Sequence, residues 1–331
     1  ENNFITNVGI GISFDFYGSP FGPGGYGNIV RNNTITNVDI GIQVWSLYEN
    51  LTIHNNTINS TDYGSSFFDS SGRAGIYLKS SSTTPNLVNM TITNNTVYSD
   101  IGIGIITDYV DGLHVKYNHI TTYSASNAFG NGIMSRNSID IIIANNVIMT
   151  NISEDSAAAG IFVYSGIDIN ISNNSITSAV GIEISAYSQS TDYIDVTHNT
   201  IQSVGYGIIS NGSFANLANN RIIGICNLSY CDVVNFEEVS KYGIFSSDST
   251  VLIRDNEINK YYELFASYIS NYNVTNNTFN FGHIGIKSNN SEGSLFLNNF
   301  TNITTINSLY KSNLLILAND YKNFDKGIYS F

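Results

Sequence analysis

The stretch "NNTITNVDIGIQV", residues 32–44, returns along the chain in altered forms such as "NNTVYSDIGIGIIT" (94–107) and "NNSITSAVGIEIS" (173–185). The shortest recurring interval between copies is 21 residues, and we expect longer intervals to hold loop insertions near residues 15–27, 61–72 and 223–240. A fixed period of this length predicts a solenoid, in which each turn packs on its neighbours. The second Asn of each copy falls at Asn3, Asn33, Asn56, Asn95, Asn118, Asn146, Asn174, Asn199, Asn220, Asn256, Asn277, Asn298 and Asn319.

Apolar side chains flank each of these asparagines at fixed offsets. Around Asn33, for example, Val30 lies three residues before it and Ile35 lies two residues after it. Steps of two with β-branched residues indicate strands. Because the two apolar positions are an odd number of residues apart, one residue between them must form a bend. The Asn then faces inward at this bend, where successive amides can form a hydrogen-bonded ladder, and the residue before it faces water.

A Gly-Ile pair follows the Asn in most copies, as at Gly41 and Gly104. It predicts a third strand, with glycine at a backbone angle that a Cβ would forbid. We therefore predict an all-β chain: a right-handed parallel β-helix with three short strands per rung, about 12–13 rungs and an inward Asn ladder. We expect one domain over residues 1–331. We also expect more chain beyond Glu1 and Phe331, because the sequence begins and ends within a repeat.

The phrases at 32–44 and 173–185 resemble the parallel β-helix repeats of carbohydrate-binding and sugar-hydrolase proteins, pectin-degrading enzymes, periplasmic copper-maturation proteins and many surface proteins. The resemblance covers essentially the whole chain. It implies a polysaccharide ligand or substrate, with carboxylates or a Ca²⁺ cluster in a groove along the helix.

Composition excludes several classes of protein. The chain is 42% hydrophobic and 12% charged, so there is enough apolar surface for a packed core. A net charge of −13 with only 13 Lys and Arg argues against binding nucleic acid. No apolar run is long enough for a membrane-spanning helix.

Candidate catalytic residues are few. The acidic candidates are Asp108 and Asp111 in "DYVDG", and Glu154 with Asp155 in "SEDS". Two carboxylates at a suitable separation could hydrolyse a glycosidic bond, but Asp is also common in turns for backbone hydrogen bonding. The motif series that the resemblance implies for pectin hydrolases has its nearest match in "GHIGIK" (282–287), where His283 precedes the repeat's own Gly-Ile and chance explains the match better.

The sequence predicts no metal site and no cofactor. The five His are spread over several rungs, and Ca²⁺ would be required only if the protein were a lyase. Cys226 and Cys231 are the two cysteines, and we expect them to form a local disulfide in an oxidising compartment, with two free thiols as the alternative.

Acceptor sequences for N-linked glycans are numerous. Five of them coincide with the position that we expect to face water, as a usable acceptor must, although a chain rich in Asn, Ser and Thr forms many by chance. With few charges and the expected disulfide, they favour an extracellular cell-surface protein and resemble surface proteins of thermoacidophilic archaea. The acceptors are Asn32, Asn50, Asn55, Asn59, Asn89, Asn94, Asn151, Asn170, Asn173, Asn211, Asn227, Asn273, Asn276, Asn289, Asn299 and Asn302.

The residue that follows each Gly-Ile pair should point outward. In four successive copies it is Tyr77, Ile106, Met134 and Phe162, which predicts an apolar stripe. Such a stripe is either a contact surface for a sugar or a neighbouring subunit, or is covered by the chain's own insertions.

Two functions remain open. The first is an extracellular glycosylated β-helix with a structural or adhesive role, as a surface-layer or filament component whose partners are N-linked glycans, surface polysaccharide or neighbouring subunits. The alternative is a polysaccharide lyase or glycoside hydrolase.

Overall fold

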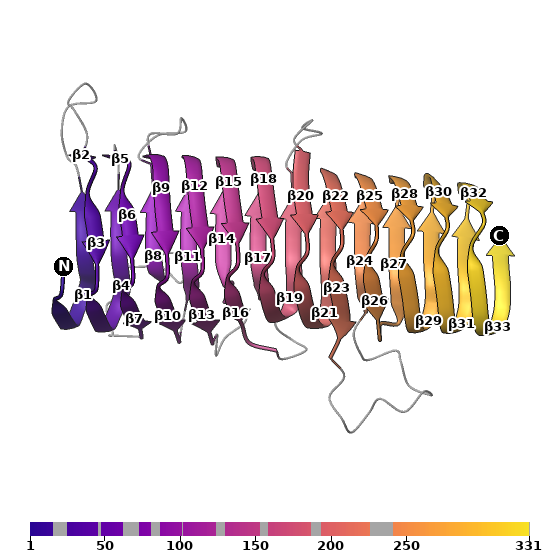
Figure 1. Ribbon diagram of the computed structural model, residues 1–331, viewed down its shortest axis with the longest axis horizontal. Helices are drawn as coiled ribbons and strands as arrows, with labels where there is room; N and C mark the ends of the chain where they lie inside the picture. The colour runs from indigo at the N-terminus through magenta and orange to yellow at the C-terminus, as the bar shows by residue number, and fades with distance from the viewer. Residues whose placement is uncertain are drawn as a thin grey trace. The chain divides into compact units, whose positions relative to one another are not determined.

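The computed structural model describes residues 1–15, 25–45, 48–61, 73–80, 87–100, 102–123, 130–152, 158–186, 193–225 and 241–330. Its contacts divide the chain into two compact units: unit 1 is Glu1–Asn151 with Asp155–Asn170, and unit 2 is Ile171–Phe331 with Ile152–Glu154. Within each unit, parallel strands stack rung on rung in sequence order (Figure 1). The predicted right-handed parallel β-helix is confirmed.

Unit 1 is built from two sets of parallel strands. The first set follows the ladder asparagines and comprises β1 (Phe4–Asp15), β4 (Thr34–Trp45), β7 (Thr57–Ser60), β8 (Ala74–Lys79), β10 (Thr96–Ser99), β11 (Ile103–Asp108), β13 (His119–Thr122), β14 (Ile133–Arg136), β16 (Val147–Met149) and β17 (Ala159–Tyr164). The second set precedes them and comprises β2 (Gly25–Tyr26), β3 (Ile29–Arg31), β5 (Tyr48–Glu49), β6 (Thr52–His54), β9 (Leu87–Thr93), β12 (Val110–Lys116), β15 (Ile139–Ala144) and β18 (Ile167–Ser172), whose last residues belong to unit 2.

Unit 2 repeats this plan. Its first set comprises β19 (Ser175–Ser185), β21 (Thr200–Asn211), β23 (Arg221–Gly224), β24 (Tyr242–Ser247), β26 (Glu257–Asn259), β27 (Glu263–Tyr268), β29 (Thr278–Asn289), β31 (Asn299–Tyr310) and β33 (Asp320–Ser330). Its second set comprises β20 (Tyr193–Thr197), β22 (Phe214–Ala218), β25 (Thr250–Arg254), β28 (Asn271–Thr275), β30 (Glu292–Phe296) and β32 (Asn313–Leu317).

The Asn ladder lies inside the coil in both units, as the sequence predicts. Asn56 donates from Nδ2 to Oδ1 of Asn95 at 3.0 Å, and its backbone N–H donates to the same oxygen at 2.9 Å. The same Nδ2 reaches the carbonyl of Val30 at 3.0 Å, so the buried amide is satisfied. These side-chain bonds join Asn3, Asn33, Asn56, Asn95, Asn118 and Asn146 in unit 1, and Asn174, Asn199, Asn220, Asn256, Asn277, Asn298 and Asn319 in unit 2.

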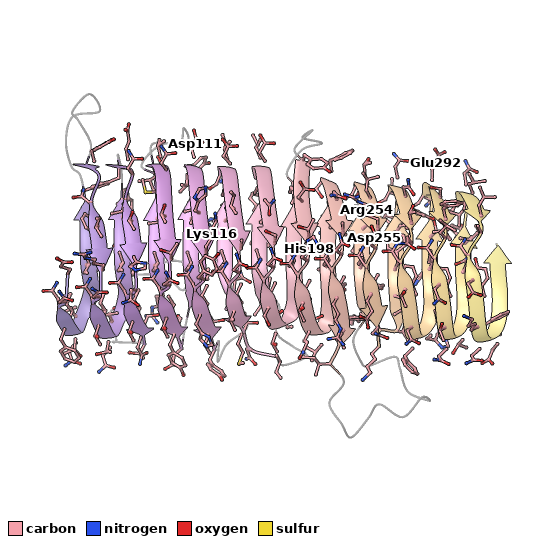
Figure 2. The ribbon with its side chains drawn as sticks, viewed as in Figure 1. Asp111, Lys116, His198, Arg254, Asp255 and Glu292 are labelled. Carbon is pink, nitrogen blue, oxygen red and sulfur yellow. The ribbon has the colours of Figure 1, made fainter. Side chains whose placement is uncertain are left out.

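The bend before each ladder Asn is made by a residue in the left-handed region. Asn32 has φ of 58° and Asn55 has φ of 54°, and in unit 2 His198 and Asp255 (Figure 2) both have φ of 58°. Asn and Asp adopt this conformation more readily than other side chains do. All four side chains are exposed, which confirms the expected outward direction.

A second ladder, not predicted from the sequence, lies at another bend of unit 2. The backbone N–H of Ser249 donates to Oγ of Ser270 at 3.3 Å, and that of Ser270 donates to Oγ of Ser291 at 3.1 Å. Each bend again has a left-handed residue before the serine, such as Asp248 with φ of 49°. Hydroxyl groups therefore satisfy buried backbone donors at this bend.

The glycine of the Gly-Ile pair is needed for a different reason from the one that the sequence suggested. Positive φ is found in Gly27, Gly112 and Gly212, and Gly243 of the Gly-Ile column is not among them. A Cβ on Gly243 would lie 2.4 Å from Cγ2 of Ile258 and 2.6 Å from the carbonyl oxygen of Leu264. The prediction of a forbidden backbone angle was therefore wrong: the glycine leaves room for the core side chain of the next rung.

Candidate functional site

Asp108, one of the acidic residues that the sequence singled out, is held by its neighbours on the next rung. Asp108 is buried in unit 1, where Nη2 of Arg136 lies 3.2 Å from its Oδ2 and Nδ2 of Asn137 donates to its Oδ1 at 3.3 Å. Asp111 is half-buried and lies beyond the bend at Tyr109, which has φ of 54°. Asp108 is thus held in an ion pair between rungs.

Several other predicted residues cannot be placed. Glu154 and Asp155, both cysteines and Asn227 lie outside the described residues, as do most of the expected insertions. Among the residues that the structure describes, no group of three or more His, Cys, Asp or Glu side chains could hold a metal ion. Over the same ranges, no helix is long and apolar enough to cross a membrane.

The predicted apolar stripe is not an exposed surface. Tyr77, Ile106 and Met134 are 8%, 0% and 7% exposed, and Phe162 is half-buried. They pack in one cluster that also contains Ile40, Ala74 and Ile103. The interpretation of these residues as an open contact surface is therefore wrong, and the stripe belongs to a hydrophobic cluster of unit 1.

The outward side chains of β21, β24, β27 and β29 in unit 2 bring rings and charges together. The strand register aligns Tyr206 with Tyr242 and Tyr242 with Glu263, which places these three side chains in one column. A neighbouring column aligns Phe245 with Ala266 and Ala266 with Lys287. We call the surface formed by Tyr206, Tyr242, Phe245, Glu263 and Lys287 the aromatic–carboxylate face.

The three rings of this face form a half-buried platform. The ring centroids of Tyr206 and Tyr242 are 5.1 Å apart with the planes at 22°, which is a stacked arrangement. Phe245 lies against Tyr242 at 5.3 Å. Burial, and then the charge of Glu263, raises the pKa of both tyrosines, so their hydroxyls stay protonated and can donate hydrogen bonds.

Glu263 is the unusual group of this face. Its residue is only 3% exposed, yet it is bound to Lys287, whose Nζ lies 2.6 Å from Oε1. The other oxygen, Oε2, is buried and has no hydrogen-bond partner in the described part of the chain. Burial raises the pKa of Glu263, and the bond to Lys287 opposes that rise. Burial alone would lower the pKa of Lys287, but the contact with Glu263 raises it.

Two further groups flank the face. Glu183 precedes the Phe245 column, because it pairs with Ile209 and Ile209 pairs with Phe245. Burial raises the pKa of Glu183. On the other side His283 stacks on Tyr262, with ring centroids 4.7 Å apart.

Sequence reasoning passed over Glu263 and Tyr242. A signal was available: "YELFASY" (262–268) aligns with "KYGIFSS" (241–247) residue for residue, which places Glu263 beside Tyr242. On this rung Leu264 and Phe265 replace the Gly-Ile pair that marks the strand elsewhere. The sequence therefore does not show which residue of this rung belongs to the outward column. Lys287 was noted only as part of a chance match.

Comparison with known proteins agrees with this architecture. Residues 65–222 match the family model described as "Right handed beta helix region". No curated protein sequence matches this chain.

Among solved structures, the catalytic unit of a thermostable alpha-1,3-glucanase from Streptomyces thermodiastaticus is similar with a TM-score of 0.55 and 14% identity, over 96% of this chain and 62% of that one. A tailspike protein variant of E. coli bacteriophage HK620 has a TM-score of 0.52 and 11% identity, over 89% of this chain and 66% of that one. A surface protein and adhesin of Streptococcus pneumoniae has a TM-score of 0.48 and 13% identity, and 92% of each chain is covered.

This chain therefore spans about three fifths of the glucanase unit. At these identities the likeness concerns the fold. Together with the parallel rungs and Asn ladders of both units, the match over residues 65–222 agrees with a right-handed parallel β-helix fold.

Proposed function

We propose that this β-helix binds a neutral polysaccharide on the aromatic–carboxylate face of unit 2. The observation that carries the proposal is the stacked pair Tyr206 and Tyr242 beside Glu263. One oxygen of Glu263 is buried and has no hydrogen-bond partner among the residues that the structure describes. Sugar rings have apolar C–H faces that pack on aromatic rings, while carboxylates and protonated tyrosine hydroxyls bond the sugar hydroxyls.

The charge of the face supports a neutral ligand. Glu183 and Glu263 outnumber Lys287, and that lysine is already engaged by Glu263. The whole chain has a net charge of −13. A polyanion would be repelled, whereas an uncharged polysaccharide would not.

Binding can be tested by affinity electrophoresis against neutral and acidic polysaccharides. Tyr242→Ala should abolish retardation by the neutral polysaccharide that binds the wild-type protein. Tyr193→Ala is a matched control, because Tyr193 is also on unit 2 and also lies against an aromatic ring, that of Phe214 at 5.5 Å, but on β20 of the other strand set. Equal retardation of the two variants would contradict the proposal.

Glycoside hydrolysis is a second candidate, favoured by the raised pKa of Glu263. A carboxyl whose pKa is raised keeps its proton to a higher pH than an ordinary carboxyl does, and in that form it can protonate a departing sugar oxygen. Release of reducing ends from the bound polysaccharide, lost in Glu263→Gln, would assign this activity. Binding without any release would leave a binding protein. The pectin-lyase-type elimination that the resemblance implied is tested by the release of unsaturated ends.

We also infer an extracellular, glycosylated protein with a structural or adhesive role. The support is that the acceptors Asn32, Asn55, Asn94, Asn173 and Asn276 are all exposed and all occupy the left-handed position before a ladder Asn. Glycopeptide mass spectrometry of native material tests this inference, and unmodified peptides at all five positions would contradict it.

A further inference from the structure

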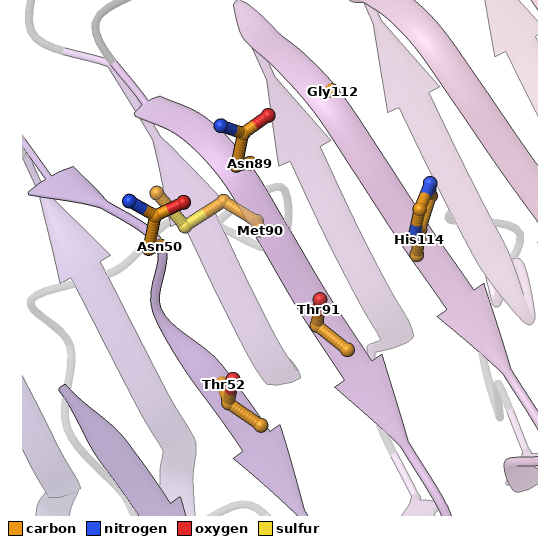
Figure 3. A pocket seen from close by; sticks show the side chains of 7 residues that line it. All are labelled: Asn50, Thr52, Asn89, Met90, Thr91, Gly112 and His114. Carbon is orange, nitrogen blue, oxygen red and sulfur yellow. The ribbon is translucent and has the colours of Figure 1, made fainter. Parts of the chain in front are cut away.

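A polar notch lies in unit 1 and shares no residue with the aromatic–carboxylate face. Its volume is about 340 Å³, and it is lined by Asn50, Thr52, Asn89, Met90, Thr91, Gly112 and His114 (Figure 3). The strand register explains the arrangement: Thr52, Thr91 and His114 are aligned on β6, β9 and β12 and form one wall.

The notch exists because one bend lacks a side chain. Asn50, Asn89, Gly112 and Asp140 hold equivalent bends of successive rungs, with φ between 51° and 69°. Every member of this run except Gly112 has a polar side chain. A Cβ at Gly112 would lie 2.8 Å from Oδ1 of Asn89, so any side chain there would enter the notch.

The polar groups around the notch are available for a ligand. Within the described ranges, no hydrogen bond uses the side chains of Asn50, Thr52, Asn89, Thr91 or His114. Amide and hydroxyl groups each offer both donors and acceptors. The interior Asn amides of these rungs hydrogen-bond to one another in the ladder, whereas the outward side chains around the notch have no hydrogen-bond partner in the described part of the chain.

The wall carries no full charge at neutral pH. Burial, and then the nearby Lys116, lowers the pKa of His114, so its ring is neutral and offers one N–H donor and one nitrogen acceptor. The Met90 side chain is buried in the core beneath the notch, with 1% of the residue exposed. A neutral group with several hydroxyls matches this polar surface, whereas an anion would find no free cation in the lining itself.

We propose that this notch is a second saccharide site, which takes one neutral sugar ring. It does not depend on the aromatic–carboxylate face, because all of its residues belong to unit 1. The sugar can come from a free glycan or from a glycan attached at Asn50 or Asn89, since both are acceptors whose Thr also lines the notch.

The test uses isotope-labelled full chain from a host that does not glycosylate, with the imidazole NMR signals of His114 as the reporter. The probes are the methyl glycosides of glucose, galactose, mannose and N-acetylglucosamine. We expect at least one of them to shift the His114 signals saturably, with a Kd of about 1 mM, the range of a weak small-ligand complex.

Gly112→Asn is the decisive variant, because Asn is already the residue of the two preceding bends and tolerates the left-handed conformation. It should weaken the response by about tenfold or more. Gly212→Asn is the matched control: Gly212 has φ of 63° at a bend of unit 2, and the substitution should leave the response unchanged.

Protein produced in a glycosylating host distinguishes a free glycan from an attached glycan as the source of the sugar. If an attached glycan fills the notch, the His114 signals will already lie at the bound position and free glycoside will not move them. If free glycan is the ligand, the same titration as before will be seen. Three results would each overturn the proposal. The first is that neither a free glycoside nor an attached glycan shifts the His114 signals. The second is an equal response in Gly112→Asn, and the third is a larger response to inorganic phosphate than to the glycosides. Tyr242→Ala should not affect this titration, so a failure of the polysaccharide site is distinguishable.

Discussion

Removing one amide from the interior ladder of unit 2 gives the sharpest test of what holds the rungs in register. Asn256 is 2% exposed, and its Oδ1 accepts from the backbone N–H of Asn220 at 2.8 Å and from Nδ2 of Asn220 at 3.0 Å. Its own Nδ2 donates to the carbonyls of Leu217 and Arg254 at 2.8 and 2.9 Å, and to Oδ1 of Asn277 at 3.0 Å. Asn256→Ala deletes all of these bonds.

The expected loss follows from the groups left behind. The buried N–H of Asn220 loses its acceptor, which costs about 1–3 kcal/mol, and the other lost bonds add about 1 kcal/mol each where the partner keeps no alternative. Because Asn220 retains a bond to the carbonyl of Val196 at 2.8 Å, we expect a total decrease in the free energy of unfolding of about 3–5 kcal/mol.

Urea unfolding followed by far-UV circular dichroism measures the change, with hydrogen exchange to locate the opening, because a repeat array can unfold in segments. Asp255→Asn is the control: Asp255 is the exposed neighbour, has φ of 58° and sits where other rungs have Asn, so the effect should stay within about 0.5 kcal/mol. The account of the ladder fails if both variants lose the same small amount.

Three further outcomes are expected. Gly243→Ala should destabilise unit 2 by about 1–3 kcal/mol in urea, because the new Cβ collides with Ile258 at 2.4 Å. Phe300→Ala should cost about 3–5 kcal/mol in the same assay, since its buried ring stacks on both column neighbours at 4.9 and 5.2 Å. The pKa of Glu263 is raised in the folded state above its ordinary value of 4.5, so the folded protein binds this proton more tightly than the unfolded chain does. The free energy of unfolding of the wild type should therefore decline relative to that of Glu263→Gln as pH rises through the raised pKa. Parallel curves for the two proteins from about pH 4.5 to 8 would refute this.

The sequence predicted the interior of this protein because the interior is periodic. Ladder residues such as Asn95, and the core residues around them such as Ile92 and Val97, recur at fixed offsets since each must meet its copy on the next rung. The serine bend recurs equally in unit 2, at Ser249 and Ser270, but at a different offset from the Asn of each repeat.

The candidate site was much harder to predict. Tyr242 and Glu263 face outward, where no neighbour inside the coil constrains residue type, so neither position shows a pattern along the chain. The spacing of the repeats places Tyr242 beside Glu263, because they are 21 residues apart. The pairing of Tyr206 with Tyr242 depends instead on strand register across the insertion near 223–240, which that spacing does not give. The polar notch is defined by a missing side chain at Gly112, and a glycine in a turn has no sequence signature that separates an open site from an ordinary bend.

The uniform spacing of the last ladder residues has a consequence for how such a chain can change. Asn256, Asn277, Asn298 and Asn319 are each 21 residues apart, and each of the first three donates from Nδ2 to Oδ1 of the next. Duplicating or excising one whole 21-residue block would therefore reproduce the same bends and bonds at the seam. The number of turns in this part of the molecule is a quantity that evolution, or a protein engineer, can adjust in whole steps without redesigning the core.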